Sequence, residues 1–288
     1  MNLILQSLAP DRPTIDRIAT LAQAQRVTPI HAHAWRCEDV TISATLKTQI
    51  DAECLAAKLD FSVVEPGRQL SGFKLLVMDM DSTLITIECI DEIADMQGLK
   101  PQVAEITEAA MRGELEFSES LTRRVALLKG LDFAALRRVY DERLQLSPGA
   151  QTMLTAIQAA GLKTLLVSGG FTFFTDRMKA RLGLDYTHAN VLEVVDGKLS
   201  GKVIGGIVDA DEKKRTVEKV CAEMGIAPQQ AIVMGDGAND LKMMGIAGLS
   251  VAFRAKPIVR AQADVALNFV GLDGMLALFE KPCTNTLP

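Results

Sequence analysis

The stretch "LLVMDMDST", residues 75–83, places Asp79 and Asp81 two positions apart at the end of an apolar run. On an extended chain this spacing is about 6.6 Å. At an effective dielectric constant of about 20, two carboxylates at that distance repel each other by roughly 2.5 kcal/mol. A divalent cation, a proton retained on one carboxyl group, or both would offset the repulsion. The pair therefore predicts a metal site, a general acid, or both at the end of a buried strand.

Two further polar groups also follow apolar runs. Ser168, Gly169 and Gly170 follow "KTLLV", and Asp236 in "GDGAND" follows "QAIVM". Ligands of parallel sheets bind beyond the carboxyl ends of the strands, so we expect these groups to converge with Asp79 and Asp81. Magnesium prefers one or two carboxylates with water and phosphate oxygens, which suits Asp79 and Asp236. A metal, a nucleophile and an acid together are what phosphoryl transfer through an aspartyl-phosphate requires.

The elements that must position these residues are predicted from the pattern of apolar runs. Five runs show no alternation of apolar and polar residues, which is typical of strands buried on both faces of a parallel sheet: residues 73–79, 163–170, 230–237, 249–253 and 264–268. Helical patterns at 149–161 and 212–225 separate them, each ending on a glycine. The pattern predicts an α/β fold with a doubly wound, Rossmann-like parallel sheet, within a catalytic domain at 71–288.

Two inserts interrupt this alternation. Residues from about 85 to 148 show helical patterns almost throughout, far more than a crossover between strands needs, and predict a helical cap over the site. Around residues 191–209, the stretch "VVDGKLSGKVIG" has Asp-Gly between apolar runs. That dipeptide predicts a small β-hairpin insert.

Residues 1–70 are predicted to form a separate, small α+β N-terminal domain. We expect strands at "NLILQSLA" and "VTISATL" (40–46), and helices at 14–25 and 52–59. His31 and His33 are expected on one face of a strand, but without a third ligand they favour ordinary surface histidines over a metal site. The domain is either a regulatory, ACT-like module that binds a small molecule or an element of a homodimer.

Composition narrows the class of protein. The chain has 288 residues, 48% of them hydrophobic, a formal net charge of -5 and a pI of about 5.4, which argues against a protein that wraps nucleic acid. The five cysteines are scattered and predict free thiols rather than disulfides or a zinc site. Neither a signal peptide nor an apolar run of about 20 residues is present. We expect a cytoplasmic protein that binds neither nucleic acid nor membranes.

The motifs "DMDST", "SGG", the lysine of "DEKK" and "GDGAND", in that order, resemble the haloacid dehalogenase-like hydrolase superfamily. Within it, "ECIDEIA", "AMRGELEF", "SLTRRVALLKG", "SGGFTFF" and "GDGANDLKMM" are similar to the phosphoserine phosphatase family. The resemblance spans residues 73–268. It implies hydrolysis of O-phospho-L-serine to L-serine and phosphate with Mg²⁺, the last step of serine biosynthesis.

The resemblance also implies roles for individual residues. Asp79 is the nucleophile, and Asp81 protonates the leaving serine oxygen and then takes a proton from water. Magnesium is held by Asp79, the main-chain carbonyl of Asp81 and Asp236, with Asp240 in support. The phosphoryl group is bound by Ser168, the Gly169 amide and Lys213, chosen over Lys214 and Arg215 by its spacing from "GDG". The remaining substrate-binding positions are Glu88 for the ammonium group, Arg124 rather than Arg123 for the carboxylate, Asn239 and Thr83 as polar contacts, and Met111 and Phe117 as apolar walls.

Two alternatives stay open at this stage. One is a phosphatase or phosphotransferase for another small phosphomonoester, such as phosphothreonine or phosphohomoserine. The other is a signalling receiver module, which also has an acidic pocket and a phosphorylated aspartate at a strand end. Receivers lack a second acid two residues after the nucleophile and lack a helical cap, so the sequence favours an enzyme.

Overall fold

The computed structural model describes residues 1–112 and 114–280, apart from the side chain of Met111. A seven-stranded sheet forms its centre, with the strand order β11-β10-β9-β5-β6-β7-β8. Neighbouring strands pair in parallel except β7 and β8, which are antiparallel. The strands are β5 (Leu75–Met78), β6 (Lys163–Phe171), β7 (Tyr186–Val195), β8 (Lys198–Ile204), β9 (Ala231–Gly235), β10 (Leu249–Phe253) and β11 (Val265–Leu267). The predicted α/β fold with a mostly parallel sheet is confirmed.

Helices cover both faces of this sheet, and alternate residues of β5 point into two different cores. Leu75 and Val77 pack in one core with α9 (Ala210–Met224), α10 (Leu241–Met244) and α11 (Pro257–Gln262). Leu76 and Met78 pack in the other with α7 (Ala150–Ala159), α8 (Thr172–Leu182) and the short helix η5 (Leu272–Leu278). Because both faces are buried, β5 is apolar along its whole length.

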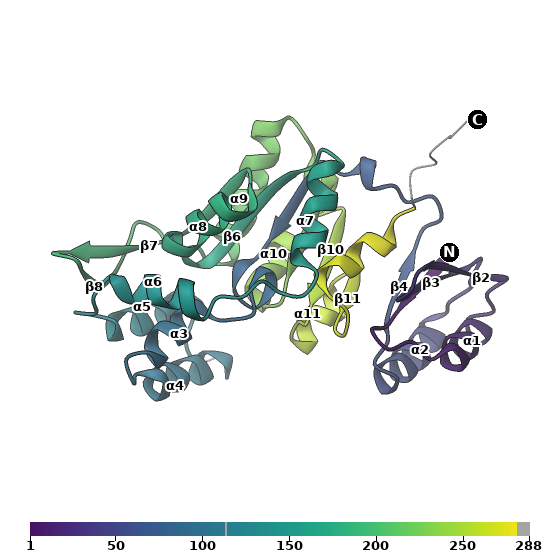
Figure 1. The fold of residues 1–288 in the computed structure, drawn as a ribbon, viewed down its shortest axis with the longest axis horizontal. Helices are drawn as coiled ribbons and strands as arrows, with labels where there is room; N and C mark the ends of the chain where they lie inside the picture. The colour runs from purple at the N-terminus through teal and green to yellow at the C-terminus, as the bar shows by residue number, and fades with distance from the viewer. Residues whose placement is uncertain (113, 281–288) are drawn as a thin grey trace.

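Four helices form the insert between β5 and β6: α3 (Cys89–Asp95), α4 (Lys100–Met111), α5 (Phe117–Leu127) and α6 (Ala134–Glu142). The side chain of Arg143, just after α6, donates to Glu92 and Asp95 of α3 at 2.5 Å each, which ties the first and last cap helices together. The cap gathers at one end of the molecule, next to the hairpin of β7 and β8 (Figure 1). The predicted helical content of this insert is confirmed.

The predicted hairpin is confirmed as well. β7 and β8 are joined by Asp196 and Gly197, whose φ angles are 50° and 74°. Positive φ at both central positions is the geometry that favours Asp-Gly in a two-residue turn. β7 begins earlier than expected, at Tyr186, so its first half belongs to the parallel sheet and its second half to the hairpin.

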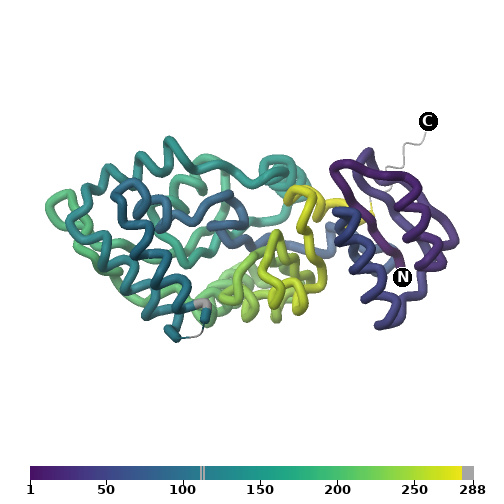
Figure 2. The backbone as a smooth tube through the Cα atoms, turned by 90° about the horizontal axis from the view of Figure 1, so that it is seen from below, coloured from purple at the N-terminus to yellow at the C-terminus, as the bar shows by residue number. Residues whose placement is uncertain are grey.

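The N-terminal residues form a second sheet of four antiparallel strands in the order β2-β3-β1-β4. The strands are β1 (Asn2–Gln6), β2 (Arg26–His31), β3 (Ala34–Glu38) and β4 (Asp60–Val64), and the helices are α1 (Arg12–Leu21) and α2 (Ala44–Ala56). Leu3 and Leu5 of β1 pack against Ile15, Ile18 and Ile50 of these helices. This sheet lies at the opposite end of the molecule from the cap (Figures 1 and 2).

Two expectations for this region are wrong. Residues 40–46 are not a strand, because Ser43 accepts a hydrogen bond from the Leu46 N–H at 3.2 Å and so begins helix α2. Capping by serine outweighs the strand preference of the neighbouring β-branched residues. His31 and His33 do not share a strand face, since His31 ends β2 and His33 lies in the turn to β3. Strands β2, β3 and β4 were not predicted.

The two sheets meet at a polar joint. The Asp60 carboxylate, at the start of β4, accepts hydrogen bonds from the amides of Asn268, Phe269 and Val270, directly after β11, at 2.7, 2.9 and 2.9 Å. Arg36 of β3 donates to the carbonyl of Phe279 at 3.0 Å. The N-terminal unit is therefore packed against the edge of the large sheet.

The sequence predicted free thiols and no segment that spans a membrane. Cys37, Cys54, Cys89 and Cys221 are buried free thiols, and Cys283 lies outside the described residues. Within the described ranges, no helix combines the length and apolar character needed to cross a membrane.

Candidate active site

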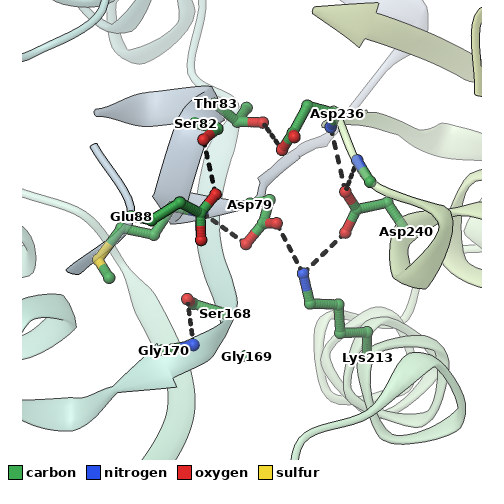
Figure 3. Close-up of polar contacts among 12 residues, drawn as sticks. Asp79, Ser82, Thr83, Glu88, Ser168, Gly169, Gly170, Lys213, Asp236 and Asp240 are labelled. Carbon is green, nitrogen blue, oxygen red and sulfur yellow. Dashed lines mark hydrogen bonds and ion pairs between the residues drawn. The ribbon is translucent and has the colours of Figure 1, made fainter. Parts of the chain in front are cut away.

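Asp79 stands where the chain leaves β5. Its N–H still donates to the Met234 carbonyl of β9 at 3.0 Å, so the central sheet fixes its position. Residues 80–84 then form one wide turn, in which Ser82 takes a positive φ of 55°. The turn keeps Ser82 and Thr83 near Asp79 (Figure 3), and Asp81 belongs to the same turn.

Lys213 joins Asp79 to a second acid. It lies on α9, whose first turn is capped by Asp209, and its side chain is fully buried. The Lys213 ammonium group is 2.9 Å from Asp79 Oδ2 and 2.7 Å from Asp240 Oδ1 (Figure 3). Burial alone would lower the pKa of Lys213, but the two carboxylates outweigh it and raise the pKa. A positive charge is thus held beside Asp79 on a side chain that solvent does not reach.

Three acids gather within reach of one cation. Carboxylate oxygens of Asp79, Asp236 and Asp240 lie within 4.8 Å of one another. Burial raises the pKa of Asp79 and the charge of Asp240 adds to this, while Lys213 opposes it. Burial, followed by the charges of Asp240 and Glu88, raises the pKa of Asp236 to about 7. Crowded, partly dehydrated carboxylates of this kind suit a divalent cation with a preference for oxygen ligands.

Asp240 accepts three hydrogen bonds, whereas Asp79 has two partners: its Oδ1 accepts from the Met80 N–H at 2.7 Å and its Oδ2 lies 2.9 Å from the Lys213 ammonium group. In Asp240, Oδ1 accepts from Lys213, and Oδ2 accepts from the amides of Asp236 and Gly237 at 3.1 Å each. Asp236 instead keeps an oxygen available, with Oδ1 accepting from the Thr83 hydroxyl at 3.1 Å. Asp240 therefore orders the loop that presents Asp236.

Asp81 faces a different environment. A Cβ atom added at Gly170 would lie 2.8 Å from Asp81 Oδ2, so Asp81 sits directly against the glycine loop after β6. Its Oδ1 is buried and has no hydrogen-bond partner among the described residues. Burial, and then the charge of Glu88, raises the pKa of Asp81 to about 8. Such a carboxyl group holds a proton near neutral pH, as a general acid must.

The loop Ser168–Gly170 lines the opposite side. Ser168 is fully buried, and its hydroxyl oxygen accepts the Gly170 N–H at 2.8 Å. The Gly169 position approaches the cap so closely that an added Cβ would lie 2.9 Å from Cζ of Phe117, at the start of α5. The glycines therefore permit both the approach of Asp81 and the contact with the cap.

The cap contributes charged side chains at the mouth of the site. Glu88 accepts a hydrogen bond from the Ser82 hydroxyl at 2.6 Å, which holds it beside the turn that follows β5 (Figure 3). Arg124 is partly buried on α5, where its strongest electrostatic partners are Asp91, Glu88 and Asp81. Arg123 is exposed and pairs with Glu119 on the same helix. Arg124, and not Arg123, is thus the arginine that interacts with the acids of the site.

The remaining residues named from the sequence take varied positions. Lys214 and Arg215 lie outside the cluster, paired with Glu218 and Glu212. Asn239 lies next to Asp240 in the short helix η4 (Ala238–Asp240), partly exposed. Met111 ends α4, but its side chain is outside the described part of the structure.

Gly170, which was expected to converge with Asp81, makes room for it. Two contributors were not predicted: Ser82 holds Glu88, and Asn190 of β7 holds the Gly169 carbonyl at 2.7 Å. Ser82 lies inside the motif "DMDST", which was a usable signal, whereas Asn190 lies in no motif that the sequence analysis used.

Comparisons with known proteins agree with this geometry. The model of the haloacid dehalogenase-like hydrolases matches residues 73–248, and the model of a domain of unknown function, DUF4072, matches residues 3–45. A phosphoserine phosphatase of Polaromonas sp. is 58% identical over 222 residues, which cover 75% of this chain and 94% of the relative.

Two solved structures extend the likeness to three dimensions. A hydrolase of the same family from Salmonella enterica serovar Typhi has a TM-score of 0.88 at 35% identity, covering 98% of this chain and all of the other. A phosphoserine phosphatase captured as a phospho-aspartyl intermediate analogue has a TM-score of 0.68 at 39% identity, covering 72% of this chain and 99% of the other.

Proposed function

The chain belongs to the haloacid dehalogenase-like hydrolase family, and we propose that it hydrolyses O-phospho-L-serine to L-serine and phosphate, the last step of serine biosynthesis. The observation that carries the proposal is the pairing of unlike acids at the end of β5. Burial raises the pKa of both, but Asp79 lies 2.9 Å from the buried Lys213 ammonium group, which favours its ionised form, whereas the pKa of Asp81 is about 8. One is placed to attack and the other to donate a proton.

In the first step, an Asp79 oxygen forms a bond to phosphorus as the bond between phosphorus and the serine oxygen breaks. Asp81 gives its proton to that departing oxygen, so serine leaves as the neutral alcohol. In the second step, the ionised Asp81 takes a proton from water, and the resulting hydroxide attacks phosphorus and releases Asp79. Asp81 ends each cycle protonated, as it began.

Charge develops on the phosphoryl oxygens during both steps. The Ser168 hydroxyl, the Gly169 amide and Lys213 are the donors we assign to these oxygens. We propose Mg²⁺ as the cation, held by Asp79, Asp236 and the main-chain carbonyl of Asp81, with Asp240 as the supporting acid because it is fully buried and accepts three hydrogen bonds. When bound, the ion neutralises the crowded carboxylates and polarises the phosphoryl group.

Specificity for phosphoserine is assigned to the mouth of the site. Glu88 offers a carboxylate to the ammonium group, and Arg124 offers a guanidinium to the carboxylate of the substrate. Asn239 and Thr83 are proposed as further polar contacts. Met111 and Phe117 are proposed as apolar walls that exclude water.

The test of the reaction is phosphate release by the purified chain with Mg²⁺. We expect turnover of O-phospho-L-serine to exceed that of phosphothreonine, phosphohomoserine and p-nitrophenyl phosphate. The Asp79→Asn variant serves as the inactive control. Turnover of the other esters without turnover of phosphoserine would disprove the assigned specificity.

Arg123 and Arg124 supply a matched pair for the specificity claim. Arg124→Ala should raise the KM for phosphoserine by about 10- to 100-fold, the loss of one charge-assisted contact. It should leave p-nitrophenyl phosphate turnover nearly unchanged, because that ester has no carboxylate to bind. Arg123→Ala should behave as wild type with both substrates, and equal effects of the two variants would contradict the assignment.

The N-terminal unit, residues 1–70, has two proposed roles that one pair of measurements separates. A regulatory unit should bind serine, measured by calorimetry on the full chain. A homodimer element should give a mass in light scattering that depends on protein concentration. We also propose a cytoplasmic location, supported by the four buried free thiols.

A further inference from the structure

Asn190 lies behind the candidate phosphate site and touches two of its elements. Its side chain is 1% exposed. The amide nitrogen Nδ2 donates to the Gly169 carbonyl at 2.7 Å, and Oδ1 accepts from the Val208 N–H at 2.8 Å. These contacts use one donor and one acceptor of the same carboxamide, so a single orientation of the side chain satisfies both.

The hydrogen bond from Asn190 Nδ2 to the Gly169 carbonyl lies where the pairing of β6 with β7 is interrupted. Val167 of β6 pairs with His188 of β7, and the next pair joins Phe171 to Asn190. Three residues of β6, Ser168 to Gly170, thus stand opposite one residue of β7 and bulge out of the ladder. The Gly169 carbonyl has lost its strand partner, and the Asn190 side chain supplies another.

The bond to Gly169 orients the catalytic loop. The Gly169 carbonyl and the Gly170 N–H belong to the same planar peptide group and point to opposite sides. Asn190 holds the carbonyl, so the Gly170 N–H is aimed at the Ser168 oxygen, which accepts it at 2.8 Å. That oxygen accepts through one lone pair, so the hydrogen of the Ser168 hydroxyl is left to donate to a phosphoryl oxygen.

The second contact reaches the other phosphate-binding element. Val208 is followed by Asp209, whose side chain caps α9 by accepting from the Glu212 N–H at 2.8 Å. The Lys213 N–H donates to the Asp209 carbonyl at 2.9 Å, so the lysine lies in the turn that this cap fixes. Asn190 therefore ties the Ser168 loop and the start of the Lys213 helix to one strand.

We propose that Asn190 is a positioning residue for phosphoryl transfer: it aligns the Ser168 hydroxyl through the Gly169–Gly170 peptide and keeps Lys213 in register with it. This inference rests on the proposed function of the site. Aspartate at this position could not donate to the Gly169 carbonyl, and serine would be too short to reach both contacts. The assigned role thus requires the carboxamide and the length of asparagine.

The same strand pair offers a control at its other end. Thr164, near the start of β6, is fully buried, and Asp185, just before β7, accepts from its N–H at 2.9 Å and its hydroxyl at 3.0 Å. This contact also ties β6 to β7 through a side chain, but Thr164 precedes Ser168 along the strand and lies at the end away from the site. Thr164→Ala therefore removes a comparable link without reaching the loop.

The experiment compares Asn190→Ala, Asn190→Asp and Thr164→Ala with wild type in the full chain. For both Asn190 variants we expect kcat for phosphoserine to fall by about 10- to 100-fold, the range for misplaced reacting groups, with KM changed by less than about threefold. Thr164→Ala should lower the melting temperature at least as much while kcat stays within about twofold of wild type. A wild-type kcat in Asn190→Ala, or equal loss of kcat in Thr164→Ala, would overturn the proposal.

A double variant tests whether Asn190 acts through Ser168. If it does, Ser168→Ala combined with Asn190→Ala should be little slower than Ser168→Ala alone, because the second change removes nothing further from the hydroxyl. If the two substitutions instead lower kcat by factors that multiply in the double variant, Asn190 does not act through the Ser168 hydroxyl.

The affinity for orthovanadate with Mg²⁺, measured by calorimetry, tests the role of Asn190 without depending on which phosphomonoester the chain hydrolyses. If wild type fails to hydrolyse phosphoserine, the proposed function fails. Asn190→Ala should still bind vanadate about tenfold or more weakly than Thr164→Ala, and equal affinities would overturn the positioning role.

Discussion

The joint at Asp60 and the cluster around Asp79 both contain buried acids, but the groups that surround the two carboxylates have opposite effects on their pKa values. At both, burial raises the pKa of the carboxyl group. At the joint, the next causes are three backbone amides, and all of them oppose the rise. At the cluster, the next cause is another carboxylate, Asp240, which adds to it.

The difference separates a structural carboxylate from a reactive one. Asp60 is supplied with neutral donors from a segment more than 200 positions away, so its charge serves to hold two units together. In the cluster, Lys213 offsets part of the repulsion among the acids, and a bound divalent cation or a proton would offset the rest. We therefore expect changes at Asp60 to act on stability and changes at Asp79 to act on chemistry.

The largest effect is expected from Asp79→Asn. Phosphate release from phosphoserine should fall by at least about a thousandfold, because the amide cannot attack phosphorus. The melting temperature without metal should stay the same or rise, since one of the crowded charges is gone. A strongly destabilised variant would show that Asp79 is structural and would erase the contrast with Asp60.

The next effect is expected from Asp60→Ala. Three amides lose their acceptor, and the free energy of unfolding should fall by about 3 kcal/mol or more, measured by denaturant titration. At a temperature where the variant is folded, kcat for phosphoserine should stay within about twofold of wild type. A large loss of kcat without a loss of stability would mean that the joint takes part in catalysis.

A smaller effect is the pH dependence of stability in EDTA. The pKa values of Asp81 and Asp236, about 8 and about 7, lie above the usual value for aspartate, so the folded chain binds protons that the unfolded chain has released. This contribution is fully present below about pH 4 and is lost as pH rises through 7 and 8. The melting temperature without metal should therefore fall between about pH 5 and about pH 8.

Two comparisons sharpen this prediction. The slope should be shallower in Asp236→Asn, and saturating Mg²⁺ should raise the melting temperature more at about pH 8 than at about pH 5, because the metal replaces the protons. A gain from Mg²⁺ that does not depend on pH would show that the carboxylates are ionised without it.

The smallest effect is expected at the rim of the joint. Glu280 pairs with Arg36 at 3.4 Å and accepts from the Gly67 amide at 2.8 Å, but its side chain is 36% exposed. Glu280→Ala should lower the free energy of unfolding by about 1 kcal/mol or less. A loss as large as that of Asp60→Ala would mean that the rim, and not the buried carboxylate, holds the units together.

Predictions from sequence were correct where the residues that determine a local structure all lie within one short segment. The apolar run before Asp79 and the turn at Asp196 and Gly197 were predicted and are present. They failed in the N-terminal unit, where strands β2, β3 and β4 were missed and residues 40–46 were assigned to a strand. The single hydrogen bond from the Leu46 N–H to Ser43 decides that segment, and propensity does not reveal it.

By itself, the sequence determined which residues end the central strands, because burial on both faces demands apolar runs and the acids that follow them are conspicuous. It also determined the family, through motifs confined to a few positions each. Only the tertiary structure decided which oxygens are already engaged: those of Asp240 by Lys213 and two amides, those of Asp60 by the segment after β11, and the carbonyl of Gly169 by Asn190. Hydrogen bonds between distant segments produce no periodic pattern in the sequence. Only the folded structure therefore shows which buried carboxylates are held by neutral donors and which face other acids.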